Sequence, residues 1–366
     1  MLNKVRSIPL RDLSVHSRIM LGATYWEAPE CIVYSNFSRL NRSFGMHHER
    51  GLWVRAVHTI PEVILGRLPQ STDLVVPSGE DFIPITQHAE ALAEQVPPYF
   101  KSDDLEKVLS WEGPVIEIGH PSVIIGRFGI RTWGHWIGEL LPKIIVVEES
   151  LPLRYKYILP AEIRSLSGFT TLLESLQYYG IGLDRLVLLS PGRYHFSELY
   201  AVSSVWSPTK IHPDAVALMR TSIKVPLQQI RRGKIALLRN ESKTRNIENV
   251  KEVARILSEN GFTPVDIGHL SFADQVQAFA SAEVVAGVLG SGFSGLLYSP
   301  DNVKVLSFAP SSWGDLFFFS LMQLRNAKLV DIRGLPAKGD QRTSANAQFE
   351  LKTSEVLGGL SILDAN

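Results

Sequence analysis

The chain has 366 residues, with 37 Lys and Arg balancing 37 Asp and Glu, and 45% of its residues are hydrophobic. This length exceeds what one hydrophobic core usually supports, so two α/β domains are predicted. The zero formal charge excludes a general nucleic-acid binder, because such proteins carry an excess of Lys and Arg. One cysteine, Cys31, excludes an intrachain disulfide and fits a reducing compartment.

The N-terminal segment Met1–Arg18 alternates charges with short apolar pieces and lacks the apolar region of a signal peptide. No window approaches the roughly 20 apolar residues that cross a bilayer. We therefore expect a soluble, cytoplasmic protein, and leave contact with the inner face of a membrane open.

The chain alternates predicted strands and helices from about residue 115 onward, whereas residues 1–110 are mixed, interrupted by proline and not assigned. This alternation predicts an α/β domain over residues 1–210, with a linker near Trp206–Pro226. The predicted strands are Val115–Ile118, Val123–Ile125, Tyr157–Leu159, Leu186–Leu189 and the extended Ser197–Val205, and the predicted helices are His135–Glu149 and Thr170–Tyr179.

Residues 211–366 show the clearest alternation and predict a second, nucleotide-binding α/β domain with a final helix. Strands and helices at this spacing form a parallel sheet, whose ligands bind at the carboxyl ends of the strands. The strands are Lys234–Leu238, Phe262–Ile267, Glu283–Val288 and Val303–Phe308, and the helices are Glu248–Asn260 with Gly261 as its C-cap, 271–282 opened by a Ser271-x-x-Asp274 capping box, one ending at Tyr298, and Thr353–Leu363.

A β-branched apolar run ends at Val288 and is followed by Gly290-Ser291-Gly292 and a predicted helix. Backbone N–H groups at such a turn, together with the helix dipole, favour an anion, and glycine lets the main chain approach a phosphate. Many α/β crossovers use glycine for packing alone, so the motif is weak in isolation.

His135 and Glu139 lie four residues apart and share a face if the segment from Trp136 is helical. A carboxylate beside an imidazole is a candidate general base. The structural alternative is a core histidine between two tryptophans, with Glu139 paired to Lys143. Pro142 removes a helical hydrogen bond to Gly138 and is expected to kink or restart the helix.

Arg239, Lys243 and Arg245 follow directly after a predicted strand. Arg suits phosphate because its planar fork binds two oxygens at once. The same cations also fit a solvated loop, and both interpretations stay open.

Four other patterns carry no predicted site. The Gly-x-Gly-x-x-Gly pattern over residues 290–295 lies on a late strand, without an acid about 20 residues downstream, so a dinucleotide site is set aside. No spaced carboxylates predict a metal site. His212-Pro213-Asp214 is typical of a helix start, and Phe317–Phe319 of a core.

In their order along residues 110–363, these motifs resemble the family-61 glycosyltransferases, many of which are bacterial polysaccharide-biosynthesis proteins. The motifs are Thr132-Trp-Gly-His135-Trp136-Ile-Gly-Glu139-Leu-Leu141-Pro142-Lys143, then Arg239 with Lys243-Thr-Arg245, Leu270-Ser-Phe-Ala-Asp-Gln275, Ala282-Glu-Val-Val-Ala-Gly287, Leu289-Gly-Ser-Gly-Phe293 and Asn346-Ala-Gln-Phe-Glu-Leu351.

The resemblance implies a GT-B-like fold, with two Rossmann-like domains facing a central cleft. It also implies an inverting glycosyltransferase that uses a nucleotide sugar, commonly a UDP-sugar, and a glycan or lipid-linked glycan acceptor, with no cofactor or obligatory metal. Glu139 is the expected base beside His135. The cations Arg239, Lys243 and Arg245, with Gly290, Ser291, Gly292 and Phe293, are the expected nucleotide-sugar site.

Four residues depart from the family pattern: Leu289 replaces a loop His, Thr132 an Asn, Val250 an acid and Gly295 an Asn. These departures motivate an alternative, a catalytically silent GT-B-like scaffold of a polysaccharide assembly complex. His135 and Glu139, which a scaffold has little need for, argue against it.

Overall fold

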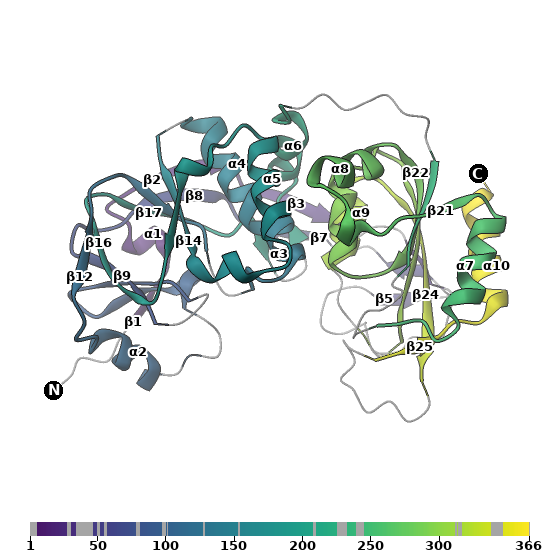
Figure 1. Cartoon of the computed structure of the whole chain (residues 1–366), viewed down its shortest axis with the longest axis horizontal. Coiled ribbons are helices and arrows are strands. Elements are labelled where there is room, and N and C mark those ends of the chain that lie inside the picture. The colour runs from purple at the N-terminus through teal and green to yellow at the C-terminus, as the bar shows by residue number, and fades with distance from the viewer. Residues whose placement is uncertain are drawn as a thin grey trace. The chain divides into compact units, whose positions relative to one another are not determined.

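The computed structural model describes residues 6–27, 31–33, 47–49, 52–54, 57–77, 81–96, 100, 102–126, 129–152, 154–207, 210–224, 233–238, 245–311, 313, 317–337 and 347–365. The chain divides into two compact units (Figure 1). Unit 1 comprises residues 1–24, 61–206 and 214–225, and unit 2 comprises residues 25–60, 207–213 and 226–366.

Unit 1 is built on two six-stranded sheets. The first has the order β1-β11-β10-β9-β16-β12, and the second β15-β14-β13-β17-β8-β2. The strands are β1 (Arg6–Ile8), β2 (His16–Leu21), β8 (Val63–Arg67), β9 (Thr72–Val76), β10 (Ile83–Thr86), β11 (Glu90–Leu92), β12 (Val115–Ile118), β13 (Ser122–Ile124), β14 (Lys156–Pro160), β15 (Leu186–Leu189), β16 (Gly192–Phe196) and β17 (Leu199–Val202).

The second sheet of unit 1 has a parallel centre, because β15, β14, β13 and β17 all pair in parallel. Its apolar side packs against the first sheet in one core that includes Ile124, Ile158, Leu74 and Phe196. The helices of unit 1 are α1 (Leu10–Leu13), α2 (Ser102–Leu109), α3 (Trp133–His135), α4 (Leu141–Ser150), α5 (Phe169–Tyr178) and α6 (Pro213–Thr221), with short turns η1 (Ala93–Gln95), η2 (Trp136–Leu140), η3 (Ala161–Ser165) and η4 (Leu183–Arg185).

Unit 2 carries a sheet of order β21-β20-β22-β23-β24-β4-β6-β5. The run from β21 to β24 is parallel, as predicted. The strands of this unit are β4 (Cys31–Val33), β5 (His47–Glu49), β6 (Leu52–Val54), β20 (Gly233–Leu237), β21 (Phe262–Pro264), β22 (Ala282–Val288), β23 (Lys304–Pro310), β24 (Lys328–Pro336) and β25 (Phe349–Glu350), with two further strand pairs, β3 (Thr24–Glu27) with β7 (Val57–Ile60) and β18 (Trp206–Ser207) with β19 (Lys210–Ile211).

Helices cover both faces of the unit 2 sheet, with α7 and α10 on one face and α8 and α9 on the other (Figure 1). Gly261, at φ +83°, ends α7, and the Ser271 side chain accepts a hydrogen bond from the Asp274 N–H at the start of α8. The predicted cap at Ser271 is therefore confirmed, whereas the C-cap of α7 is Asn260 and the predicted Gly261 directly follows it. The helices and turns are α7 (Val250–Glu259), α8 (Phe272–Ala280), α9 (Phe317–Leu324), α10 (Thr353–Asp364), η5 (Ile267–His269) and η6 (Ser291–Tyr298).

The α/β class is confirmed in both units, but the predicted boundary at residue 210 differs from the observed division at two segments. Residues 25–60 belong to unit 2 because β4 pairs with β24. Residues 214–225 belong to unit 1, where the Tyr179 hydroxyl donates to the Met219 carbonyl. The predicted linker therefore contains helix α6.

Candidate functional site

The first candidate site lies where β13 and β17 leave the second sheet of unit 1. These neighbouring strands are parallel, so the chain segments that follow them emerge at the same edge. Helix α3 begins at Trp133 beyond β13, while Ser204 and Trp206 follow β17. The edge of the parallel sheet therefore brings the predicted histidine motif together with residues almost 70 positions later in the chain.

The motif helix contains one π-helical turn, Trp136–Leu140. The Leu141 N–H donates to the Trp136 carbonyl five residues earlier. Pro142 has no N–H to offer, and α4 starts at Leu141 with this proline in its first turn. The predicted restart is confirmed, and it takes the form of a π turn, a local irregularity that is frequent at functional sites.

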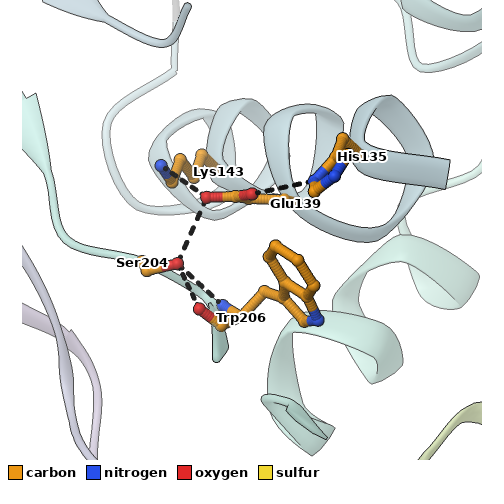
Figure 2. A network of polar contacts seen from close by, with 5 residues as sticks. All are labelled: His135, Glu139, Lys143, Ser204 and Trp206. Carbon is orange, nitrogen blue, oxygen red and sulfur yellow. Dashed lines mark hydrogen bonds and ion pairs between the residues drawn. The ribbon is translucent and has the colours of Figure 1, made fainter. Parts of the chain in front are cut away.

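Glu139 lies in this turn, and its carboxylate is almost completely buried, with 1% of the side chain exposed. Lys143 Nζ lies 3.3 Å from Oε1 and is itself 2% exposed. The Ser204 hydroxyl lies 3.2 Å from the same oxygen, and Figure 2 shows the carboxylate between Lys143 and His135 with Ser204 beneath it. The buried carboxylate thus has a buried counter-ion, as burial of a charge requires.

His135 is the part of this network that solvent reaches, since 28% of its side chain is exposed. Its Nδ1 lies 3.6 Å from Glu139 Oε2. The ring of Trp206 meets the imidazole edge to face, with the centroids 4.8 Å apart (Figure 2). On another side, Gly129 lies so close that a Cβ there would come 3.1 Å from the imidazole. These contacts hold the imidazole in place and direct Nδ1 toward the carboxylate.

Both sequence interpretations of this motif therefore describe part of the structure. Glu139 does pair with Lys143, and it also contacts His135. Sequence reasoning missed Ser204 and Trp206. Their signal was available, because they directly follow an extended segment, and such positions at the ends of parallel strands commonly carry site residues.

The second candidate site lies at the carboxyl edge of the unit 2 sheet, where β22 ends. Gly290 precedes η6, so the predicted helix is present, and it has the 3-10 form. Ser291 and Gly292 are half-buried, and a Cβ on Gly292 would lie 3.1 Å from Ile267. Gly290 itself is buried, so Ser291 and Gly292 are the residues of this predicted cradle that solvent reaches.

The structure corrects the expectation for Phe293. Its side chain is fully buried and packs edge to face against Phe318, with centroids 6.4 Å apart, so it belongs to the core and not to a ligand-contacting surface. Leu289 is also fully buried. Leu289, which stands where the family pattern has a loop His, therefore does not contribute its side chain to the accessible surface of this turn.

Arg245 belongs to the same edge of the sheet, because it follows β20. Its guanidinium lies 4.5 Å from the centroid of the Trp313 ring. Arg239 and Lys243, predicted with it, lie outside the described residues. Trp313 is buried, with 7% of its surface exposed.

Arg333 and Asp331, next to Trp313, form a buried ion pair in which Nε lies 2.5 Å from Oδ2. Arg333 also donates to the Trp313 carbonyl at 2.8 Å, and the Ser307 hydroxyl donates to Asp331 at 2.5 Å. No sequence pattern pointed to this network, since the three polar residues lie in apolar strands.

Comparison with known families gives the identity of the motif region. Residues 133–306 match the model of the family described as Glycosyltransferase 61. This part of the chain is a glycosyltransferase 61 domain. The match begins at the histidine helix and extends past the glycine turn, so it includes the histidine motif, Arg245 and the turn. The predicted family is confirmed.

The chain also shows a weak similarity to a solved structure. The structure titled bacterial iron-containing dodecameric glycosyltransferase TibC, from enterotoxigenic E. coli H10407, aligns with 70% of this chain and 77% of its own, at 12% identity and a TM-score of 0.29. At that score the two structures superpose only loosely. No curated protein sequence matches significantly.

None of the described helices is long and apolar enough to cross a membrane. Within the same residues, no three His, Cys, Asp or Glu side chains gather in a way that fits a metal ion.

Proposed function

We propose that this glycosyltransferase inverts the anomeric carbon as it transfers a sugar from a nucleotide sugar, a UDP-sugar in the first instance, to a glycan or lipid-linked glycan. A lipid-linked acceptor brings the protein to a membrane surface. The observation that supports this most directly is a partly exposed imidazole, His135, beside a buried carboxylate whose charge a buried lysine balances.

In this proposal His135 is the general base, and Glu139 positions it. Sequence reasoning favoured Glu139 as the base, but its burial and its contacts with Lys143 and Ser204 leave little room for an acceptor hydroxyl. With Nδ1 toward Glu139, the other ring nitrogen, Nε2, takes the acceptor proton. The acceptor oxygen then bonds to the anomeric carbon while the bond from that carbon to the phosphate oxygen breaks.

The diphosphate that leaves carries additional negative charge, and we assign its stabilisation to unit 2. Arg245, with Arg239 and Lys243 of the sequence prediction, supplies positive charge. Gly290, Ser291 and Gly292 offer main-chain N–H groups. No metal is invoked, because these groups can balance the developing charge.

The first experiment is a calorimetric titration of the protein with UDP, GDP, CMP and NADH in the absence of added metal. Selective binding of one nucleoside phosphate identifies the sugar nucleotides for turnover assays, and we expect UDP. Binding without transfer or hydrolysis of any sugar nucleotide would support the scaffold alternative. Binding of none contradicts the donor site.

The second experiment tests the base. We expect His135→Gln to lower transfer about 10²- to 10⁴-fold while the nucleotide dissociation constant stays unchanged, and Glu139→Gln to remove most transfer in the same way. His195→Gln is a matched control, because His195 is also 28% exposed and also contacts a carboxylate, Asp73. Transfer by His135→Gln at the control's level contradicts the assignment.

A further inference from the structure

Trp313 and Arg245 form a stacked pair at the edge of the unit 2 sheet. The guanidinium carbon lies 4.5 Å from the ring centroid, well within the range of a cation–π interaction. Tryptophan is the strongest aromatic partner for a cation, and the interaction gains strength when the ring is shielded from water. At 7% exposure, the Trp313 side chain is shielded in this way.

The backbone of Arg245 is fixed by its neighbours. Arg245 has φ +56°, an uncommon conformation for a residue with a side chain. Directly after it, the Asn246 carbonyl accepts from the Phe349 N–H at 3.0 Å, and the Glu248 N–H donates to the Phe349 carbonyl at 2.9 Å. These two bonds to β25 hold the segment that carries the guanidinium.

The backbone of Trp313 is fixed independently. Its N–H donates to the Pro310 carbonyl at 3.0 Å, and its carbonyl accepts from Arg333 at 2.8 Å. Arg333 is anchored by its ion pair with Asp331, in which both side chains are completely buried. The ring is therefore held by a part of the core that does not depend on Arg245.

Aromatic contacts place this pair at the same edge as the glycine turn. Trp313 lies 6.4 Å from Phe318, and Phe318 lies 6.4 Å from Phe293, between ring centroids. Phe293 belongs to the turn itself, since its N–H donates to the Gly290 carbonyl at 2.8 Å. The stacked guanidinium and the main chain of the turn thus belong to one packed cluster.

We propose that Trp313 is a positioning residue for diphosphate recognition, which holds the Arg245 guanidinium so that its N–H groups meet the diphosphate of the donor nucleotide. This inference rests on the proposed function. A guanidinium above a ring contacts it with its flat face, and its N–H groups lie at the edge of that plane. Because the guanidinium is already ordered, less side-chain entropy is lost when the diphosphate binds.

The decisive experiment changes the ring's electrostatics without changing its shape. The protein is produced with 5-fluoro-, difluoro- and trifluorotryptophan, and its affinity for UDP and for inorganic pyrophosphate is measured by calorimetry. Each added fluorine withdraws electrons from the ring face and weakens its attraction for a cation. We expect a stepwise loss of affinity for both ligands, about threefold to tenfold at the end of the series.

The chain has seven tryptophans, so the series is repeated in Trp313→Phe, where we expect the fluorine dependence to vanish. Trp313→Leu is expected to weaken UDP binding about fivefold to tenfold. Combined with Arg245→Gln, it should weaken binding no further than Arg245→Gln alone. Arg255→Gln, an exposed arginine of α7, is the control and should leave UDP affinity unchanged.

The results separate this inference from the proposed function. If no nucleotide and no pyrophosphate binds the unmodified protein, both are wrong. If UDP binds and Arg245→Gln weakens it, but fluorination and Trp313→Leu do not, the donor site stands and the role of Trp313 is overturned. Additive effects of Trp313→Leu and Arg245→Gln also overturn it.

Discussion

At the scale of single residues, the buried pair of Glu139 and Lys143 affects both the stability of the fold and the environment of His135. Both side chains are at most 2% exposed, with Nζ 3.3 Å from Oε1. Removing one partner of a buried pair leaves an uncompensated charge, which costs far more than an exposed pair contributes. Lys143 therefore stabilises the charged carboxylate beside His135, and replacing either member of the pair is expected to destabilise the fold.

We predict that Lys143→Met lowers the free energy of unfolding by about 3 kcal/mol, as measured by urea denaturation. Adding Glu139→Gln should restore most of that loss, because the double variant has no buried charge at this place. Arg255→Met is the matched control: it removes another i,i+4 pair, with Glu259, but both side chains are about 60% exposed, and we expect a loss below about 1 kcal/mol. Equal losses of unfolding free energy in Lys143→Met and Arg255→Met would contradict the prediction.

The residues of the histidine motif could be predicted from the sequence because they are close together in the chain. Spacing of four residues brings His135, Glu139 and Lys143 to one face through local geometry alone. Ser204 and Trp206 reach their places through sheet topology, which a local pattern does not contain. Asp331 and Arg333 are two residues apart on β24 and share a face of the strand, but the sequence does not show that this face is buried. The burial of Phe293 and Leu289 was likewise invisible, since an apolar residue beside a glycine turn fits either core or ligand.

At the scale of elements, the packing of α8 against η6 explains why position 295 holds a glycine. The family resemblance expects Asn at position 295, and this chain has Gly295. A Cβ there would come 2.0 Å from the ring of Phe279, which is fully buried in α8. The ring of Phe279 thus occupies the space that a side chain at position 295 would need.

We predict that Gly295→Ala destabilises the protein by about 1 to 3 kcal/mol through overpacking, seen as a lower thermal midpoint. Phe279→Leu in the same chain should recover part of the loss by making room. Gly233→Ala, at a position where a Cβ meets nothing within 4 Å, is the control. A Gly295→Ala variant as stable as that control would show that α8 can shift to accommodate the methyl group.

The elements themselves were largely predictable in the second half of the chain, where caps and apolar runs agree. Strand β22 and helix α7 lie within two residues of their expected bounds. In the first 110 residues, β1 pairs with β11 and β2 with β8, and no local signal identifies these partners, because they lie far along the chain. The 3-10 form of η6 also escaped prediction, because the sequence pattern of a short helix does not separate the two helical forms.

At the scale of the whole molecule, the two units are interleaved along the chain. Residues 25–60 add strands β4, β6 and β5 to the sheet of unit 2, and β4 pairs with β24 through Leu329–Asp331. A fragment that starts at residue 211 therefore lacks three strands of its own sheet. It exposes the edge of β24, a long and largely apolar strand.

We predict that residues 211–366 expressed alone are insoluble or unfold without a cooperative transition, as measured by far-ultraviolet circular dichroism during heating. Joining residues 25–60 to residues 207–366 by a flexible Gly/Ser linker should restore a soluble, cooperative fragment. Cooperative unfolding of the fragment without residues 25–60 would show that β24 tolerates an open edge.

The pairing of β4 with β24 also determines when folding can finish during synthesis. Cys31 and Leu329 are partners in register, yet about 300 residues separate them, and ribosomes add about 5 to 20 residues per second. Residues 25–60 therefore leave the ribosome about 15 to 60 s before their partner strand exists. The strands of unit 1, whose partners emerge earlier, can pair in that interval, so unit 1 should fold first while an early segment of the chain waits for the last third to be made.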